Sequence, residues 1–306
     1  MAVMQVNIGT TSLRNPVILA AGTCGVMGEI ADAIDLATIG AITTKSITKD
    51  PRIGNEPLRM AELPGGMINA IGLANEGIES FVLNQAPKVS SINATVIGSI
   101  AGDTIDNYVS VAGAMDEIDG INLVEINVSC PNTPDGMEFG ATPERLATLL
   151  REIRPALSHS SMIVKLSVAS GNVCPHAEMA IECGADALTL INTIPAMAIN
   201  VDSRSPRIGK GVGGMSGQSI HPIAVRVVHE VYRDVAKDAS IPIIGTGGIM
   251  HWKDAAEFIL AGATAVGIGT ALFINPSIAT TISKKLGSWV ERQGCSSVDE
   301  LVGAMK

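Results

Sequence analysis

Short apolar runs rich in β-branched residues recur along this chain at spacings too wide for β-hairpins. The runs cover residues 17–20, 41–44, 95–100, 123–126, 163–166, 187–191, 241–245 and 265–268. Helical patterns separate them, and the segments 143–157, 174–183, 222–236 and 252–261 are amphipathic. Strands that alternate with helices predict a parallel α/β fold, and eight strands are the number that closes a (β/α)8 TIM barrel.

Two further elements lie outside this repeat. Residues 5–15 alternate in polarity and turn at Gly9-Thr10, which predicts an N-terminal β-hairpin plugging the base of the barrel. Residues 276–293 predict a C-terminal helix. No linker or shift in composition divides the chain, so we expect one domain over residues 1–306. A doubly wound open sheet would share the alternation, but the strand number and the strand ends favour the barrel.

The residues that close the predicted strands are polar or glycine. Along the chain they are Thr23, Lys45-Ser46, Ser99, Asn127, Lys165, Asn192-Thr193, Gly247-Gly248 and Gly269-Thr270. In a barrel all of these meet on one face. Because they supply two lysines, amides and hydroxyls but no carboxylate, they indicate a site for an anionic, electron-rich planar group rather than for a metal.

The two lysines at strand ends each have two interpretations. Lys165 follows apolar residues and needs a partner when buried. A reduced flavin, which carries negative charge near N1 and O2, would supply that partner, whereas the absence of an acidic strand-end residue disfavours a core carboxylate. Lys45 is expected to reach the flavin and a substrate carboxylate or carbonyl; the alternative is a solvated loop lysine.

Glycine-rich turns follow the last two predicted strands, at residues 244–249 and 267–270. Backbone N–H groups without Cβ bulk can donate to phosphate oxygens there, and residues 213–217 could add more. One such turn is often only a tight loop, but two predict a phosphate site. A single phosphate beside a flat ring indicates FMN rather than a dinucleotide. No Gly-x-Gly-x-x-Gly motif opens the first βα turn, so NAD is not expected to bind this chain directly.

Asn127-Val128-Ser129-Cys130-Pro131-Asn132 places an amide and a thiol directly after a predicted strand. Both would reach the same mouth of the barrel, which makes Cys130 the first catalytic candidate. A small buried thiol that only ends a strand is the alternative. No His, Asp and Glu cluster has metal-ligand spacing, and we expect the five histidines to cap helices or face solvent.

Composition narrows the function further. With 306 residues, 46% hydrophobic, the chain can bury a large core. A net charge of −9 without a basic run gives no reason to bind nucleic acid or anionic lipid, so small substrates are expected. Five scattered cysteines predict a reducing compartment, and no apolar run reaches the roughly eighteen residues of a membrane span. These features predict a soluble, cytoplasmic protein without a membrane segment.

Taken together, these motifs resemble those of the class 1 dihydroorotate dehydrogenases, and in detail class 1B, over nearly the whole chain. The matching segments are residues 44–46, 51–57, 69–73, 127–132, 165–166, 191–193, 213–217, 245–248 and 269–270. Asn69-Ala70-Ile71-Gly72-Leu73 is similar to the 1B sequence, whereas 1A enzymes typically carry Ser-Met in its middle. Class 2 enzymes use a serine base and carry an N-terminal membrane-binding extension.

The resemblance implies an FMN enzyme that oxidises (S)-dihydroorotate to orotate in pyrimidine (UMP) biosynthesis. The Cys130 thiolate would take the C5 proton while hydride leaves C6 for flavin N5. Implied substrate contacts are Lys45, Asn69, Ala70, Ile71, Gly72, Leu73, Asn127, Asn192 and Thr193. Implied FMN contacts are Thr23, Lys45, Ser46, Ser99, Asn127, Lys165, Ile191, Gly217, Gly247, Gly248, Gly269 and Thr270. Ser99 departs from the asparagine frequent in the family.

Resemblance to class 1B also implies a partner subunit that carries FAD and an iron–sulfur cluster and passes electrons to NAD. The expected assembly is a homodimer of this chain, flanked by two partner chains in a heterotetramer. Two other functions stay open: a flavin barrel acting on another dihydropyrimidine, and a non-catalytic barrel that binds a phosphate ligand. A dihydrouridine-reducing enzyme needs a basic RNA-binding face, which the acidic balance disfavours.

Overall fold

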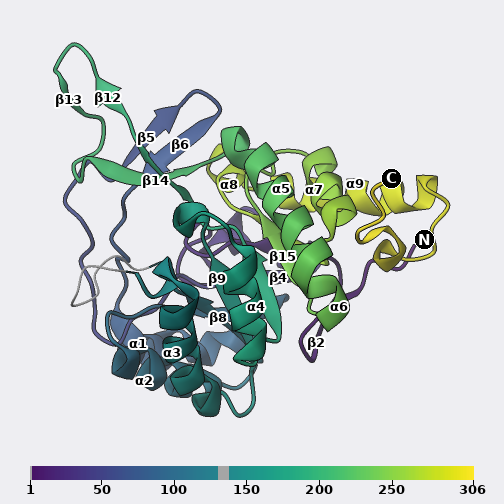
Figure 1. Cartoon of the computed structure of the whole chain (residues 1–306), viewed down its shortest axis with the longest axis horizontal. Helices are drawn as coiled ribbons and strands as arrows, with labels where there is room; N and C mark the ends of the chain where they lie inside the picture. Colours follow the sequence, from purple (N-terminus) through teal and green to yellow (C-terminus); the bar gives the residue numbers. More distant parts are fainter. Residues whose placement is uncertain (1, 130–137) are drawn as a thin grey trace.

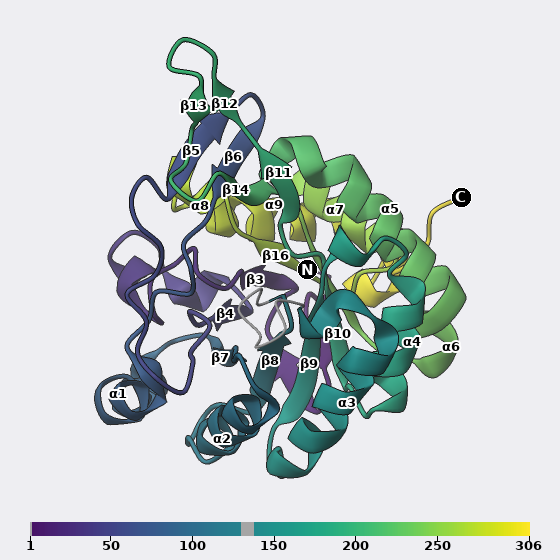
Figure 2. The same ribbon diagram turned by 60° about the vertical axis from the view of Figure 1, so that its left-hand side comes forward.

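The computed structural model describes residues 2–129 and 138–306 of the chain. Its centre is a closed barrel of eight parallel strands, which confirms the predicted fold (Figures 1 and 2). The strands are β3 (Val17–Leu19), β4 (Ala41–Thr43), β7 (Thr95–Ile100), β8 (Leu123–Asn127), β9 (Ser161–Leu166), β10 (Ala187–Leu190), β15 (Ile243–Thr246) and β16 (Ala265–Ile268). Every residue of β3, β4, β9, β10 and β16 is buried, as expected for parallel strands covered on both faces.

Helices surround the barrel, as Figure 2 shows. They are α1 (Gly77–Asn84), α2 (Ile105–Asp116), α3 (Pro143–Ile153), α4 (Cys174–Glu182), α5 (His221–Val231), α6 (Lys237–Ala239), α7 (Trp252–Ala261), α8 (Ala271–Ile274) and α9 (Ile278–Arg292). Side chains at the N-caps of α2, α3 and α7 accept backbone hydrogen bonds. The helix predicted over 222–236 is confirmed, as α5 followed directly by a π-helix at Tyr232–Ala236. The predicted C-terminal helix is confirmed as α9.

A second sheet, which the sequence did not predict, rises beside the barrel (Figure 1). Its strands run in the order β11 (Ile194–Met197), β14 (Val212–Ser216), β6 (Gly66–Asn69) and β5 (Met60–Leu63). A small hairpin, β12 (Ile199–Asn200) with β13 (Ser205–Pro206), extends it. These strands are short and only half buried, so they lack the continuous apolar runs that indicate barrel strands.

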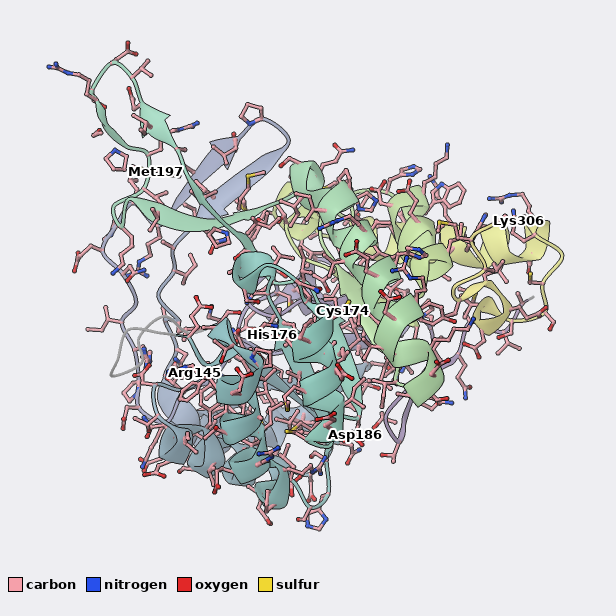
Figure 3. All side chains as sticks on the ribbon, in the orientation of Figure 1. Arg145, Cys174, His176, Asp186, Met197 and Lys306 are labelled. Atoms are coloured by element: carbon pink, nitrogen blue, oxygen red, sulfur yellow. The ribbon has the colours of Figure 1, made fainter. Side chains whose placement is uncertain are left out.

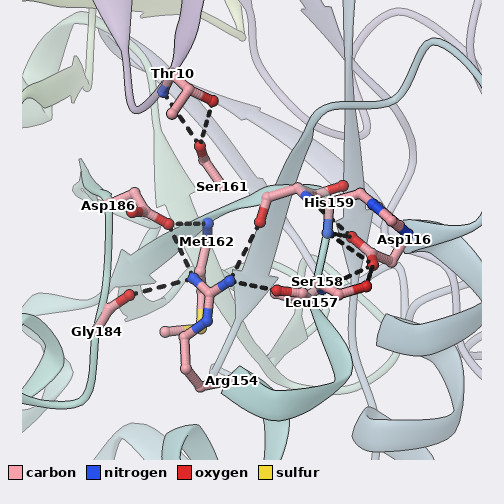
Figure 4. Close-up of polar contacts among 11 residues, drawn as sticks. Thr10, Asp116, Arg154, Leu157, Ser158, His159, Ser161, Met162, Gly184 and Asp186 are labelled. Carbon is pink, nitrogen blue, oxygen red and sulfur yellow. Dashed lines mark hydrogen bonds and ion pairs between the residues drawn. The ribbon is translucent and has the colours of Figure 1, made fainter.

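The N-terminal hairpin, β1 (Val6–Ile8) with β2 (Thr11–Leu13), is confirmed. At its turn, the N–H of Thr10 donates to Ser161 Oγ at 3.3 Å, at the start of β9 (Figure 4). Gly9 lies at φ +54°, and a Cβ there would come within 2.3 Å of the same oxygen. The hairpin therefore packs on the amino-terminal end of the barrel strands, the base that was predicted for it.

A buried carboxylate organises the loop that leads into β9 (Figure 4). Asp116, which is 5% exposed, ends α2 and accepts hydrogen bonds from the N–H groups of Ser158, His159 and Ser160. Although burial opposes its ionisation, these hydrogen bonds lower the pKa of Asp116 below its usual 3.8. Within the described residues, no helix combines the length and apolar character needed to cross a bilayer.

Replacing Asp116 by asparagine is expected to destabilise the fold by about 1–3 kcal/mol at neutral pH, because one amide oxygen cannot accept these hydrogen bonds. A carboxylate with a lowered folded-state pKa stabilises the protein above pH 3.8 and loses that contribution as the pH falls through the folded-state value. Urea unfolding should therefore show the gap between wild type and Asp116→Asn shrinking in acid. The exposed Asp119→Asn, three residues after Asp116 and before β8, is the matched control; a gap that does not change with pH would contradict the assignment.

Candidate active site at the carboxyl ends of the barrel strands

The structure brings the polar residues predicted at the strand ends to one end of the barrel. Lys45 and Ser46 follow β4, Asn127 ends β8, and Lys165 is the penultimate residue of β9. Ile191, Asn192 and Thr193 follow β10, Gly247 and Gly248 follow β15, and Gly269 and Thr270 follow β16. The register aligns Asn127 with Lys165 on neighbouring strands, so the amide and the ammonium group lie at the same height.

A chain of hydrogen bonds joins the amides and hydroxyls of this end. Asn192 Nδ2 donates to Asn127 Oδ1 at 3.2 Å, and Asn127 Nδ2 donates to Ser46 Oγ at 3.3 Å. Ser46 Oγ lies 2.9 Å from Ser99 Oγ. Tyr108 also fixes this region, because its hydroxyl donates to the backbone oxygen of Asn127 at 2.7 Å. Four of the predicted residues are thus linked side chain to side chain.

Lys165 pairs with a core carboxylate, the partner that the sequence analysis disfavoured, so that expectation is wrong. Its Nζ lies 3.6 Å from Glu125 Oε1, and both side chains are less than a tenth exposed. Glu125 also accepts a hydrogen bond from Thr189 Oγ1 at 2.9 Å and is 3.5 Å from Ser99 Oγ. The sequence analysis missed Glu125 because it lies within the apolar run of β8 rather than at a strand end. An acidic residue inside such a run was the available signal.

Lys45 is half buried rather than a solvated loop lysine. Its side chain crosses the first βα turn, where a Cβ on Gly22 would lie 3.2 Å from Lys45 Nζ. Burial, and then the positive charge of Lys165, lowers the pKa of Lys45 from its usual 10.5. Two ammonium groups therefore share one mouth with one buried carboxylate, an arrangement that attracts an anion.

The glycine turns form a close-set backbone cradle. Gly247 and Gly248 lie at φ +146° and +68°, and a Cβ on Gly248 would come within 2.6 Å of the backbone oxygen of Gly217. Thr270 Oγ1 donates to Ser216 Oγ at 2.8 Å and ties the turn after β16 to β14. Within residues 2–129 and 138–306, the N–H groups of Gly247, Gly248 and Thr270 donate to no acceptor. Unpaired N–H groups are rare unless a ligand or water accepts from them, so the cradle suits an anion.

The predicted substrate segment, Asn69 through Ala70, Ile71 and Gly72 to Leu73, leaves the end of β6. Asn69 Nδ2 donates to the backbone oxygen of Gly214 at 3.2 Å, and a Cβ on Gly214 would meet Thr193 Oγ1 at 2.0 Å. Asn69 and Thr193 therefore lie on either side of one glycine. Gly72 and Leu73 both have positive φ, which curls the segment back on itself.

Cys130 and Thr23 are the remaining predicted site residues. Cys130 lies outside the residues that the structure describes, so its place in the site stays a prediction. Its neighbour Ser129 is held by a hydrogen bond of 3.3 Å from its N–H to Asn127 Oδ1. Thr23 donates to the backbone oxygen of Ala20 at 2.7 Å and packs near Gly269. Thr23, in the turn that follows β3, therefore lies beside the turn that follows β16.

The expectation that all the histidines cap helices or face solvent is wrong for two of them. His251 does cap α7, but His176, in α4, and His221 are buried (Figure 3 labels His176). The structure also brings His221, Asp254 and Glu257 within 4.8 Å of one another. The sequence showed no such cluster because α5 supplies the histidine and α7 supplies both carboxylates.

Glu125→Gln is expected to lower the free energy of unfolding by about 3 kcal/mol or more, because Lys165 then remains charged and unpaired in the core. The double variant Glu125→Gln/Lys165→Met should recover most of this loss, since it removes both charges. Denaturant unfolding of wild type, Glu125→Gln, Lys165→Met and the double variant measures the coupling between the two side chains. A Glu125→Gln protein as stable as wild type would show that the pair does not compensate the lysine.

Comparison with known proteins adds to this geometry. A family model described as dihydroorotate dehydrogenase matches residues 3–290. A relative from Bacteroides thetaiotaomicron, named dihydroorotate dehydrogenase B (NAD(+)), catalytic subunit, is 43% identical over the full length of both chains. A protein of the same name from Desulforudis audaxviator is 44% identical and covers 98% of this chain and 96% of its own.

A solved structure also shares the fold. The dihydroorotate dehydrogenase of Eimeria tenella, crystallised in complex with ferulenol, superposes with a TM-score of 0.80. The match covers 98% of this chain and 88% of that one at 20% identity, so it supports the fold alone. The family model and the full-length relatives carry the assignment further: this chain belongs to the dihydroorotate dehydrogenase family.

Proposed function

We propose that this chain is the catalytic subunit of a class 1B enzyme that oxidises (S)-dihydroorotate to orotate in pyrimidine biosynthesis, with FMN as its cofactor. One observation carries the proposal. The same end of the barrel holds the linked amides, the two lysines and the glycine cradle with its unpaired N–H groups. The names of the full-length relatives agree with it.

The residues present fit FMN. The N–H groups of Gly247, Gly248 and Thr270 suit a phosphate, and Gly217 and Gly269 border the same cradle. Lys165 carries a positive charge that suits the electron-rich edge of a flavin ring, with Ser46, Ser99, Ile191 and Thr23 as further contacts. Bound FMN supplies the hydride acceptor that the oxidation requires.

The chain's own side chains perform the rest of the reaction. Asn127 and Asn192, fixed by their mutual hydrogen bond, hold the dihydropyrimidine ring, and Asn69 and Thr193 close the other side. Lys45 pairs with the substrate carboxylate. Cys130, as thiolate, removes the C5 proton. We further propose that a homodimer of this chain binds two partner subunits that carry electrons to NAD, in the cytoplasm.

Anaerobic dihydroorotate should bleach the yellow flavin of the purified protein. In Cys130→Ala, bleaching at neutral pH should slow by about 100-fold or more, since a general base typically contributes 10²–10⁴. Stopped-flow absorbance measures the rate. Cys295→Ser, which changes a cysteine of the C-terminal region, is the control and should bleach like wild type. Equal rates in wild type and Cys130→Ala would refute the base, and a colourless protein that binds no FMN would refute the function.

Orotate binding should weaken at alkaline pH, starting below the usual lysine pKa of 10.5, because the pKa of Lys45 is lowered. Neutral Lys45 no longer attracts the orotate carboxylate, so affinity is retained at lower pH and lost as the pH rises. Spectral titration of the FMN-loaded protein with orotate measures this. Lys45→Arg keeps its charge and should show no such loss. Wild-type affinity that stays constant up to pH 10.5 would contradict the role of Lys45.

A further inference from the structure

His221 is a buried histidine that the proposed reaction does not use. It begins α5, directly after the 3-10 turn Gln218–Ile220, and is 8% exposed. Its Nδ1 lies 3.1 Å from the backbone oxygen of Gly247, and its Nε2 lies 3.1 Å from Glu257 Oε2. Phe258 packs edge-on against the ring at 5.2 Å. The ring is therefore fixed between the glycine turn and α7.

Both hydrogen-bond partners of the ring are acceptors. A backbone oxygen has no proton to give, so Nδ1 must carry a hydrogen to bond Gly247. The carboxylate of Glu257 also accepts, so Nε2 must carry one as well. The ring that satisfies both contacts is an imidazolium, and its positive charge lies directly against the turn that holds Gly247 and Gly248.

The contact with Gly247 also sets the direction of a neighbouring donor. The oxygen of Gly247 and the N–H of Gly248 belong to one planar peptide unit and point in opposite directions. Holding the oxygen toward His221 therefore aims the N–H of Gly248 away from the ring. A Cβ on Gly248 would lie 2.8 Å from His221 Cβ, so the histidine is packed tightly beneath this turn.

We propose that His221, bridged as an imidazolium to Glu257, is the positioning residue for the phosphate end of FMN. It rests on the proposed function, because the cradle must hold the cofactor phosphate. His221 orients the Gly248 N–H toward that phosphate and places a positive charge behind the turn. The expected consequence is that phosphate recognition depends on the protonation of one histidine.

The groups around the ring set the sign of this pH dependence. Glu257 and Asp254, both on α7, are the titratable groups that the structure places beside it. Asp254 Oδ2 is already occupied by the N–H groups of Met250 and His251. The 245–249 turn, residues 217–220 and the first turn of α5 contribute uncharged residues. When rising pH removes the proton on Nε2, the bond to Glu257 and the positive charge behind the turn are both lost, while the Nδ1 bond to Gly247 can remain, so FMN affinity should fall through the lost charge.

The test compares FMN with riboflavin, which lacks the phosphate. The apoprotein is titrated with each flavin, followed by flavin fluorescence, between about pH 6 and about pH 9, which spans histidine titration. For His221→Gln, the Kd for FMN should rise about tenfold, the value of one hydrogen bond to a charged group, while the Kd for riboflavin changes little. The FMN phosphate itself titrates near pH 6 in both proteins. The pH dependence of the FMN Kd that wild type shows beyond that of His221→Gln therefore reports the histidine alone.

Glu257→Gln gives an independent test, because its side chain is 58% exposed and its replacement does not threaten the core. Glu257→Gln should still bind FMN, but the Kd for FMN should lose the pH dependence that wild type shows beyond that of His221→Gln. The controls are the exposed His159→Gln, near the base of the barrel, and Glu230→Gln, whose carboxylate pairs with Arg226 on α5. Both should match wild type with either flavin.

Each outcome decides the proposal. Equal weakening of FMN and riboflavin in His221→Gln, or no weakening of either, overturns the proposal. If that variant does not fold, the ratio of the Kd values for FMN and riboflavin is compared between wild type and Glu257→Gln, and the same pH dependence of this ratio in both proteins overturns the proposal. If EDTA weakens FMN binding and zinc restores it, a metal rather than a proton occupies Nε2, and the proposal is wrong. A wild-type protein that binds no FMN overturns this proposal and the proposed function together, whereas a failure of the variants alone overturns only the role of His221.

Discussion

The ion pair between Glu125 and Lys165 is the constraint on which the carboxyl end of this barrel depends. A charged group in the interior is unfavourable by several kcal/mol unless it is paired and hydrogen bonded. Glu125 meets that condition through Lys165, Thr189 and Ser99, which come from three different strands. Ser99 continues to Ser46, whose hydroxyl accepts from Asn127. The contacts that compensate the buried charge therefore also fix the amides at the mouth.

Strand register makes this network possible. Asn127 is aligned with Lys165 and Lys165 with Thr189, while Ser99 is aligned with Glu125. Because successive side chains of a strand point to opposite faces, a shift of one residue in any of these strands would turn a polar group out of the barrel and an apolar one in. The apolar runs that surround these residues define the register. The strand register that packs the apolar core is thus the same register that places the polar residues inside the barrel.

The sequence predicted what repeats and missed what depends on tertiary contact. The eight strands, the hairpin at residues 5–15 and the helix near residues 276–293 follow from local patterns of polarity, and all were confirmed. The sheet formed by β5, β6, β11 and β14 has no such pattern, because its strands are short and half exposed. Glu125 was hidden by its apolar neighbours, and the contact of His221 with Glu257 joins residues 36 positions apart. Such pairs are set by how helices and strands pack.

The two ends of the mouth follow a common physical rule, in which a buried polar side chain orients the groups that face the ligand. At the amide end, the carboxylate of Glu125 contacts Lys165 and Ser99 and so fixes the ammonium group that faces the mouth. At the glycine end, His221 lies beneath Gly247, and the groups it orients are backbone N–H donors. Backbone donors require that glycines occupy the turn, since a Cβ on Gly248 would strike Gly217 and His221. Geometry at this end is therefore determined by residues that never touch a ligand, and it changes when the buried residue beneath the turn changes, even if every glycine is kept.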